Sequence, residues 1–152
     1  MTTLQDILTP GRTACRVQGV SKKRLFETIA NLVSQEIPAL TAHVVLDQLN
    51  ARERLGSTGM GGGIAIPHSR VENCPAPVGA LLTLADPLPF DAPDDQPVDL
   101  LFVLLVPAEA NQEHLDILAE IARLLSQDDI CRRLRAANDA DALYEIVSSE
   151  SL

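Results

Sequence analysis

The chain has 152 residues, of which 46% are hydrophobic and 22% charged, and its formal net charge is −9. A chain of this length buries about two thirds of the surface that it exposes when unfolded, so a single domain over residues 1–152 is expected. The acidic charge excludes most nucleic-acid-binding proteins, which need a basic face, and no apolar run reaches the roughly 18 residues of a membrane-inserted helix.

The first third of the chain carries the apolar spacing of two helices. Ser21 is a suitable N-cap for the first, whose apolar residues recur every three or four positions before Pro38. Thr41 can cap the second, which is expected to end near Arg54 and Gly56. A glycine-rich segment therefore begins where a helix ends.

The middle of the chain is predicted to form a sheet. A short apolar run at 64–66 and two long runs at 78–86 and 98–107 are typical of buried strands. Between the long runs, residues 87–97 contain four prolines and three aspartates. This segment is predicted to be an exposed connection that is too polar for the core.

The last third of the chain is predicted to be helical. Asn111 can cap a helix whose apolar stripe extends from Leu115 to Leu125. Two shorter helices are expected over 128–134 and 139–147, each begun by an aspartate that can serve as its N-cap. Strands interleaved with helices indicate a single α/β sandwich.

Residues 56–70, GSTGMGGGIAIPHSR, place five glycines and a proline before one histidine. A phosphate-binding P-loop needs a lysine and a hydroxyl after its last glycine, but Ile64 follows Gly63. A dinucleotide-binding turn must open a helix, which Pro67 disfavours. We expect the glycines to form a mobile or tightly turned collar that presents His68 and leaves backbone amides free for a phosphoryl group.

An exposed imidazole at His68 suits few chemistries. A nucleophilic serine or cysteine would need a nucleophile elbow, which the sequence lacks. A metal site is not expected, because His43, His68 and His114 lack metal-binding spacing and three widely spaced cysteines form no CxxC pair. Reduced thiols also favour the cytoplasm. The third option, beside a nucleophilic triad and a metal site, is phosphoryl transfer through a phosphohistidine at His68, and the structural alternative is a surface histidine without function.

The segment RERLGSTGMGGGIAIPHSR resembles the active-site signature of the enzyme IIA family of the bacterial phosphoenolpyruvate-dependent phosphotransferase system, fructose and mannitol type. The segments SKKR, QPVDLLFVLLVPAE and ICRRLRAANDADALYEIV are similar to the nitrogen-related enzymes IIA in particular. The resemblance extends from about Leu4 to Val147. It implies a single-domain α/β fold in which a mixed β-sheet is flanked by α-helices on both faces.

The resemblance also implies roles for individual residues. His68 corresponds to the phosphorylated nucleophile, His114 and Arg52 to residues beside the phosphoryl group, and Ser57 and Thr58 to residues that bind phosphoryl oxygens. Two alternatives follow from the residues themselves. His114 could cap or pack within its helix, and Arg52 could interact with the dipole of the helix that it ends.

Two sites in the signature depart from the family pattern. The family often has Asn at the position of Gly62 and Gly-Lys at the positions of Ser69 and Arg70. The loop therefore lacks a polar side chain at Gly62, and the cation that follows His68 is an arginine instead of a lysine. The local geometry of the loop is the property that these changes affect.

The function implied by the resemblance is that of a cytoplasmic phosphocarrier of the nitrogen-related phosphotransferase system. Its phosphoryl donor would be a histidine phosphocarrier protein, and its targets regulatory proteins of potassium transport and of nitrogen and carbon balance. No cofactor is expected, and a homodimer stays open. The alternatives are a stand-alone sugar-specific enzyme IIA that passes phosphate to a permease partner, and a non-catalytic protein-binding sensor domain. The lack of a permease domain in the chain favours regulation.

Overall fold

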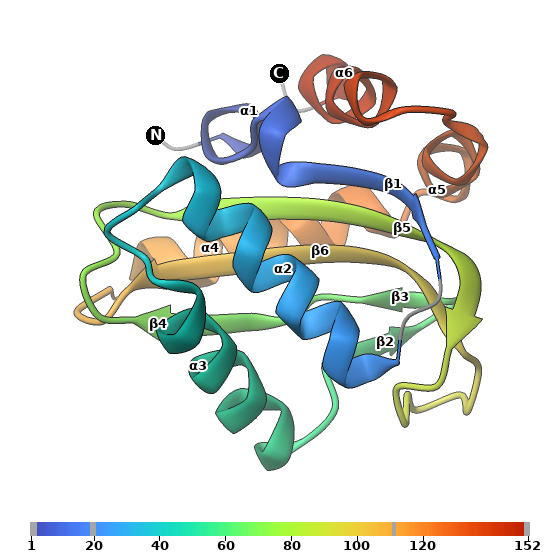
Figure 1. Ribbon diagram of the computed structural model, residues 1–152. Helices are drawn as coiled ribbons and strands as arrows, with labels where there is room; N and C mark the ends of the chain where they lie inside the picture. Colours follow the sequence, from blue (N-terminus) through green and yellow to red (C-terminus); the bar gives the residue numbers. More distant parts are fainter. Residues whose placement is uncertain (1–2, 19–20, 111, 151–152) are drawn as a thin grey trace.

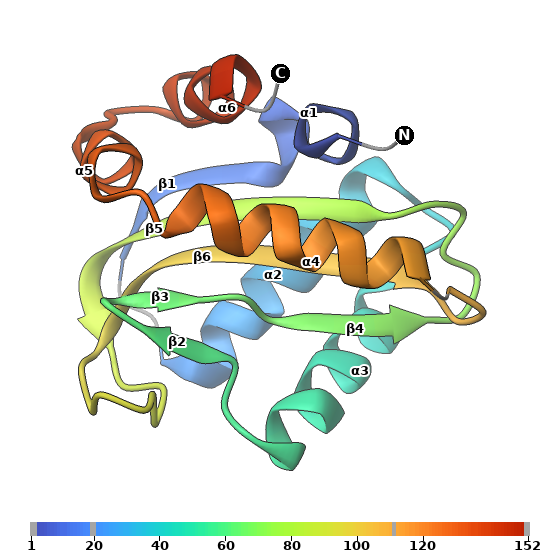
Figure 2. The same ribbon diagram turned by 180° about the vertical axis from the view of Figure 1, so that it is seen from behind.

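A mixed β-sheet with helices on both faces forms the protein (Figures 1 and 2). The computed structural model describes residues 3–18, 21–110 and 112–150. The strand order is β1-β5-β6-β3-β2, with β4 also paired to β6. The β5–β6 and β2–β3 pairs are antiparallel, and the others are parallel. The strands are β1 (Thr13–Val17), β2 (Gly59–Gly61), β3 (Ile64–Ala65), β4 (His68–Val71), β5 (Val78–Leu88) and β6 (Val98–Pro107).

Two helices cover one face of the sheet, and the remaining helices lie on the other face or beside β1. Helices α2 and α3 lie in front of the sheet in Figure 1, and α4 lies in front of it in Figure 2. This arrangement confirms the predicted fold class. No helix in the described parts of the chain is long and apolar enough to cross a membrane. The helices are α1 (Leu4–Ile7), the 3-10 turn η1 (Pro10–Arg12), α2 (Lys22–Glu36), α3 (Ala42–Leu55), α4 (Gln112–Leu125), α5 (Asp128–Ala136) and α6 (Ala140–Glu150).

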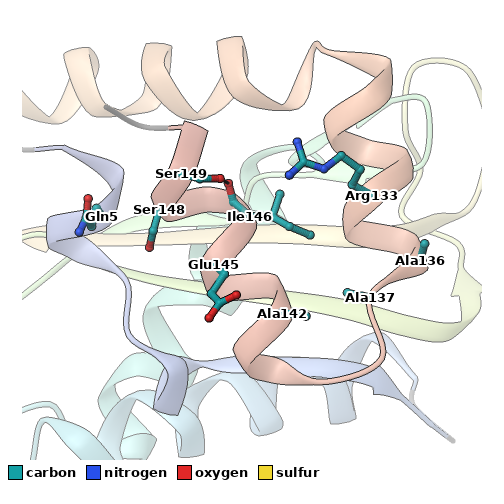
Figure 3. A pocket seen from close by; sticks show the side chains of 9 residues that line it. All are labelled: Gln5, Arg133, Ala136, Ala137, Ala142, Glu145, Ile146, Ser148 and Ser149. Atoms are coloured by element: carbon teal, nitrogen blue, oxygen red, sulfur yellow. Dashed lines mark hydrogen bonds between the residues drawn. The ribbon is translucent and has the colours of Figure 1, made fainter.

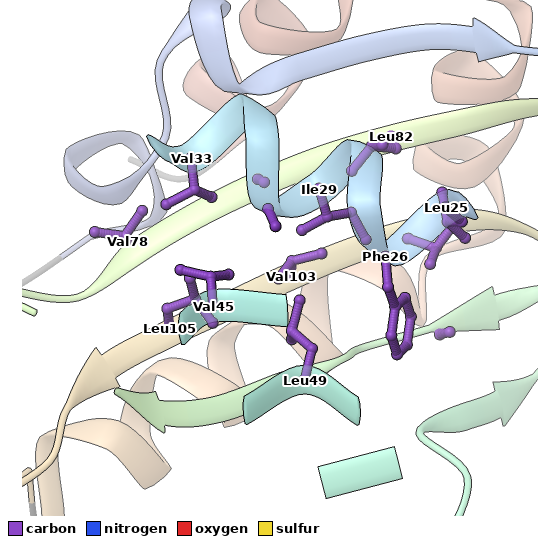
Figure 4. Close-up of a cluster of buried hydrophobic side chains, with 14 of the residues drawn as sticks. Leu25, Phe26, Ile29, Val33, Val45, Leu49, Val78, Leu82, Val103 and Leu105 are labelled. Carbon is purple, nitrogen blue, oxygen red and sulfur yellow. The ribbon is translucent and has the colours of Figure 1, made fainter. Parts of the chain in front are cut away.

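Strand β6 supplies side chains to the apolar clusters on both faces of the sheet. Val103 packs with Ile29 of α2 and Leu49 of α3 in one cluster (Figure 4). Its neighbour Phe102 packs with Ile121 of α4 and other apolar residues in the second cluster. Because successive side chains point to opposite faces and both faces are covered, the strand is apolar along almost its whole length.

The predicted caps of the first two long helices are confirmed. The Ser21 hydroxyl accepts a hydrogen bond from the backbone N–H of Arg24 at 3.2 Å, and the Thr41 hydroxyl accepts one from Val44 at 3.4 Å. Helix α3 ends at Leu55 with a glycine as its C-cap, as expected. The local signals at these helix ends are therefore sufficient to predict them.

The predictions for the helix starts near the C-terminus are only partly correct. The Asp139 carboxylate accepts the backbone N–H of Ala142 at 2.8 Å, as a capping aspartate does. Asp128, however, is the first residue of α5, and Gln127 holds the N-cap position without a side-chain hydrogen bond. Asp128 instead adds negative charge to the first turn, where the helix dipole favours it. The predicted cap Asn111 lies outside the described residues.

The prediction of an exposed connection over residues 87–97 is wrong in two places. Strand β5 continues through Leu88, and the Phe90 side chain is only 1% exposed. The Phe90 ring lies 6.2 Å from the ring of Phe26 on α2. The aromatic side chain gains more from burial than the surrounding prolines and aspartates lose, because those residues can remain at the surface.

The first part of the chain contains structure that the sequence patterns did not indicate. Helix α1, the turn η1 and strand β1 precede α2, and β1 pairs in parallel with β5. Arg12 in η1 is buried, and its guanidinium donates to the carbonyls of Ile7 and Gly79 and to the carboxylate of Glu36, at 2.7–2.9 Å. These bonds fasten the N-terminal segment to the sheet and to α2.

Candidate active site

His68 begins a strand that β6 holds in register. Ala65 of β3 pairs with Leu101, and His68 of β4 pairs with Leu104, so both strands advance by three residues across the gap between them. Pro67 lies in this gap and has no N–H to donate, but its carbonyl accepts the N–H of Leu104 at 2.9 Å. The interruption therefore alters local pairing without shifting the position of His68.

The ring of His68 is oriented by a backbone carbonyl. Its Nδ1 atom lies 2.7 Å from the carbonyl oxygen of Ile66. A carbonyl can only accept a hydrogen bond, so Nδ1 carries the proton, and the neutral ring has its lone pair on Nε2. The N–H of Ile66 in turn donates to the carbonyl of Thr58 at 3.0 Å, which fixes this residue from its other side. Nε2 is thus the nitrogen of the half-buried ring that carries a lone pair and could act as a nucleophile.

Strand alternation brings a second histidine to His68. Val71 of β4 belongs to the apolar cluster beneath α2 and α3, so His68, three positions earlier, points to the face covered by α4. His114 lies in the first turn of α4, and the centroids of the two imidazole rings are 6.3 Å apart. The structure therefore brings together two of the residues that the sequence analysis selected.

The His114 ring is held in its neutral form. Burial lowers the pKa of His114 from its ordinary value, and the positive charge of Arg70, together with that of His68 when its ring is protonated, lowers it further. Its Nδ1 atom is buried and makes no hydrogen bond to any described residue. A neutral imidazole beside His68 can donate one hydrogen bond without adding a second positive charge to the site.

Arg70 is the nearby residue for which the sequence analysis assigned no role. It lies two positions after His68 in β4 and shares its face of the strand. Its side chain is exposed, and within the described residues no carboxylate or carbonyl accepts a hydrogen bond from its guanidinium. The sequence signal that could have revealed Arg70 is its position two residues after His68 in an extended segment, where both side chains point to the same face.

Arg52 lies in the last turn of α3, where its half-buried side chain turns toward the helix end. Its Nη1 donates to the carbonyl of Gly56 at 2.9 Å. No contact within the described residues joins it to either histidine. A role beside the phosphoryl group remains a prediction for Arg52, and the observed bond is also what an arginine that stabilises a helix terminus would make.

Ser57 and Thr58 use their hydroxyls within the protein. Ser57 donates to the carbonyl of Phe90, and Thr58, which is 4% exposed, donates to the Glu53 carboxylate at 2.5 Å. A phosphoryl oxygen would have to compete with these acceptors. The phosphoryl-binding role of Ser57 and Thr58 therefore remains a prediction, and their observed bonds shape the segment before the glycines.

The glycines form a hairpin turn between β2 and β3. Gly62 and Gly63 are the two turn residues, and their φ angles of 66° and 80° match the left-handed conformation that such turns require. The N–H of Gly62 donates to Asp94 at 2.9 Å, and its carbonyl accepts from Arg135 at 2.8 Å. The expectation of a tight turn is confirmed, whereas that of a free amide is wrong for Gly62.

A large pocket lies away from the histidines. It has a volume of about 760 Å³ and is lined by side chains of α1, α5 and α6 and of the segment that joins α5 to α6 (Figure 3). None of the residues selected from the sequence lines it. Within the described residues, no three histidine, cysteine or acidic side chains are grouped so that they could hold a metal ion. The candidate site is therefore the histidine pair.

A comparison with known protein families identifies the class to which the chain belongs. The sequence profile described as "Phosphoenolpyruvate-dependent sugar phosphotransferase system, EIIA 2" matches residues 6–150. The match spans nearly the whole chain. The chain belongs to this family.

Within the family, the chain is similar to nitrogen regulatory proteins. It is 54% identical to the "Nitrogen regulatory protein" of Pseudomonas aeruginosa, with 97% of this chain and 96% of the relative covered. The protein of the same name from Escherichia coli is 45% identical, with 97% and 91% covered. The crystal structure of the nitrogen regulatory protein IIA-Ntr from Neisseria meningitidis superimposes with a TM-score of 0.88 at 40% identity, with 95% and 98% covered.

Proposed function

We propose that this protein is a phosphocarrier whose His68 is reversibly phosphorylated on Nε2. The observation that carries the proposal is the hydrogen bond from Nδ1 to the Ile66 carbonyl, which leaves the lone pair on Nε2. Phosphoryl transfer needs such a lone pair in line with the phosphorus, and otherwise depends on positioning and charge stabilisation. The half-buried ring of His68, which the Ile66 carbonyl orients, provides this lone pair.

The proposed donor is the phosphohistidine of a histidine phosphocarrier protein. The Nε2 lone pair of His68 forms a bond to phosphorus while the phosphorus–nitrogen bond of the donor breaks, and the electron pair of that bond returns to the donor imidazole. The proton on Nδ1 of His68 stays on the ring and keeps its bond to Ile66. No metal or cofactor is required. The reaction is reversible because reactant and product both carry the phosphoryl group on an imidazole nitrogen.

We assign supporting roles to His114 and Arg52. His114 has its ring 6.3 Å from that of His68, centroid to centroid, and in its neutral form can donate to a phosphoryl oxygen. Arg52 would have to exchange its bond to Gly56 for one to the phosphoryl group when the donor arrives. Truncation of either side chain is expected to slow transfer and to leave the fold intact.

The surroundings of the site suit a protein donor. A small hollow of about 210 Å³ lies between the β2–β3 hairpin and the C-terminal part of α4, and its apolar lining includes Met60, Ile64 and Ile66, the residue whose carbonyl orients His68. Met60 is 56% exposed, and Leu115 of α4 is 55% exposed. Exposed apolar side chains around a polar centre are typical of a surface that binds another protein.

The proposed output is regulation in the cytoplasm through the phosphorylation state of His68. Phosphorylation adds about −1.5 to −2 charges, which changes the partners that a surface can bind. The similarity to nitrogen regulatory proteins supports a nitrogen-type phosphocarrier as donor. Proteins of potassium transport and of nitrogen and carbon balance are the proposed targets.

The test of the phosphocarrier function is a reconstituted transfer. The protein is incubated with labelled phosphoenolpyruvate, enzyme I and the nitrogen-type phosphocarrier, together with the variants His68→Ala and His43→Ala. His43 is the matched control, because it is an exposed histidine on α3 that pairs with Asp47 at 3.3 Å. We expect acid-labile, base-stable label on the wild type and on His43→Ala, bound at Nε2 by nitrogen-15 NMR, and none on His68→Ala.

Two outcomes would redirect the proposal. An unlabelled wild type would exclude a phosphocarrier and favour a non-catalytic binding domain. A deletion strain that takes up fructose or mannitol poorly would favour a sugar-specific enzyme IIA that passes its phosphate to a permease partner. Normal sugar uptake combined with label on His68 is the result that we expect.

A further inference from the structure

Arg70 places a positive charge on the same face of the sheet as the two histidines. Arg70 and His68 lie two positions apart in β4, and strand geometry directs such side chains to the same face. The parallel pairing with β6 holds this register, with Arg70 opposite Val106 and His68 opposite Leu104. His114 lies on this face too, since its ring is 6.3 Å from that of His68.

Two other basic side chains, Arg52 and Lys22, already have partners, whereas the Arg70 side chain makes no hydrogen bond or ion pair within the described residues. Arg52 donates to the carbonyl of Gly56, and Lys22 forms an ion pair with Glu53 at 2.7 Å. No acceptor among the described residues bonds to the guanidinium of Arg70. Its charge nevertheless acts on the site, because it contributes to the lowered pKa of His114.

We propose that Arg70 binds the phosphoryl group on His68 and thereby sets how much of the protein holds phosphate at equilibrium. The proposal rests on the phosphocarrier function. A phosphoryl group on Nε2 presents three oxygens, and a guanidinium can donate to two of them at once. Such a pair exists only in the phosphorylated state, so it stabilises the product of transfer relative to the free protein.

The equilibrium is the quantity that this contact controls. The donor and His68 both carry the phosphoryl group on an imidazole nitrogen, so the two sides of the reaction are close enough in energy for one contact to shift the equilibrium. A charge-assisted contact on one side shifts the equilibrium toward that side, typically by about tenfold or more. A regulatory protein gains from this shift, because it retains its phosphoryl group and its signal when little donor is present.

The experiment measures the transfer equilibrium between the phosphorylated donor and the full-length protein for the wild type, Arg70→Gln and Arg70→Lys. We expect Arg70→Gln to lower the equilibrium constant about tenfold and Arg70→Lys to lower it less, because lysine keeps the charge but not the two-point geometry. Arg123→Gln is the matched control. Arg123 is an exposed arginine on α4 that pairs with Glu120 at 2.7 Å, and its loss is expected to leave the equilibrium unchanged.

A second readout tests the location of the charge without any transfer. Proton NMR of unphosphorylated Arg70→Gln is expected to show the pKa of His114 raised toward its ordinary value, because the repulsion from the guanidinium is gone. A purely structural role for Arg70 would not produce this change together with an intact fold. Arg123→Gln is again the control.

The outcomes separate this proposal from the phosphocarrier function. A wild type that accepts phosphate and an Arg70→Gln variant with the same equilibrium constant would overturn the role of Arg70 alone. An unchanged pKa of His114 in Arg70→Gln would also overturn it, because the charge would then not reach the site. A wild type that accepts no phosphate would overturn both proposals.

Discussion

The two sides of strand β4 have very different surroundings. On one side Val71 is 1% exposed and belongs to the apolar cluster that α2 and α3 cover. On the other side His68 is half-buried and Arg70 is exposed, with His114 of α4 as their neighbour. A strand of four residues thus serves the core with one face and the chemistry with the other. Alternation separates stability from function, so each can be changed without the other.

The largest expected effect is a loss of stability when the apolar cluster beneath α2 and α3 is disrupted. Phe26 of α2 is 1% exposed and packs beside Phe90, so Phe26→Ala leaves a cavity in the core (Figure 4). We expect the free energy of unfolding to fall by about 3–5 kcal/mol, measured by urea denaturation. Phosphate transfer per folded molecule should remain close to that of the wild type.

The control for this change is Leu115→Ala on α4, where the side chain is 55% exposed. Its effect on the free energy of unfolding should stay within about 0.5 kcal/mol. If Phe26→Ala slowed transfer in the folded fraction, the separation of the two faces would be wrong.

A second test concerns the polar side and its dependence on pH. The pKa of His114 is lower in the folded protein than in the unfolded chain, so the unfolded chain binds a proton more readily. This difference lowers stability as the pH falls through the ordinary histidine range near about 6.5, and it has no effect well above that range. Urea denaturation of wild type and His114→Gln at pH 8 and pH 5 measures it.

The variant is expected to lose less stability than the wild type between the two pH values. His43→Gln, which changes an exposed histidine on α3, should keep the loss seen in the wild type. Equal losses for wild type and His114→Gln would mean that His114 is not held neutral by its surroundings.

The smallest expected effect distinguishes the two residues of the glycine turn. A Cβ at Gly62 would meet nothing within 4 Å, and asparagine tolerates the left-handed φ of 66° better than most residues. We expect Gly62→Asn, the residue that the family often carries, to change stability by no more than about 0.5 kcal/mol and to leave transfer unchanged.

The neighbouring position is the control. A Cβ at Gly63 would lie 2.7 Å from Nη2 of Arg135 and 3.1 Å from the Asp99 carboxylate, so Gly63→Asn should destabilise by about 1 kcal/mol or more. Thermal unfolding compares the two variants. The opposite order would show that the turn is not formed as described.

The parts of the fold that the sequence predicts are those with long, regular patterns. Helical spacing of apolar residues and the caps Ser21 and Thr41 predict α2 and α3. Long apolar runs predict β5 and β6. Strand β4 gave no such signal, because its sequence HSRV has one apolar residue and depends on pairing with β6. A short strand of this kind is specified by tertiary contacts rather than by local pattern.

The same reasoning explains which site residues could be found. His68 stands out because a proline and five nearby glycines precede it, and two of those glycines, Gly62 and Gly63, form the hairpin turn. The proximity of His114 came from the resemblance alone, since it depends on how α4 packs on the sheet. Arg12 gave no signal at all, because two of its three acceptors, Glu36 and Gly79, lie far from it in the sequence.

The carbonyl of Ile66 has a consequence for mutagenesis. It fixes the proton of His68 on Nδ1, a task that many proteins give to a carboxylate side chain. Every amino acid at position 66 would supply the same carbonyl, so a substitution scan would record only the loss of an apolar anchor. This acceptor can be weakened only in the main chain, for example by an α-hydroxy acid in place of Pro67, which makes the Ile66 carbonyl part of an ester and removes the proline ring. Heritable variation can therefore displace this proton acceptor but can never delete it.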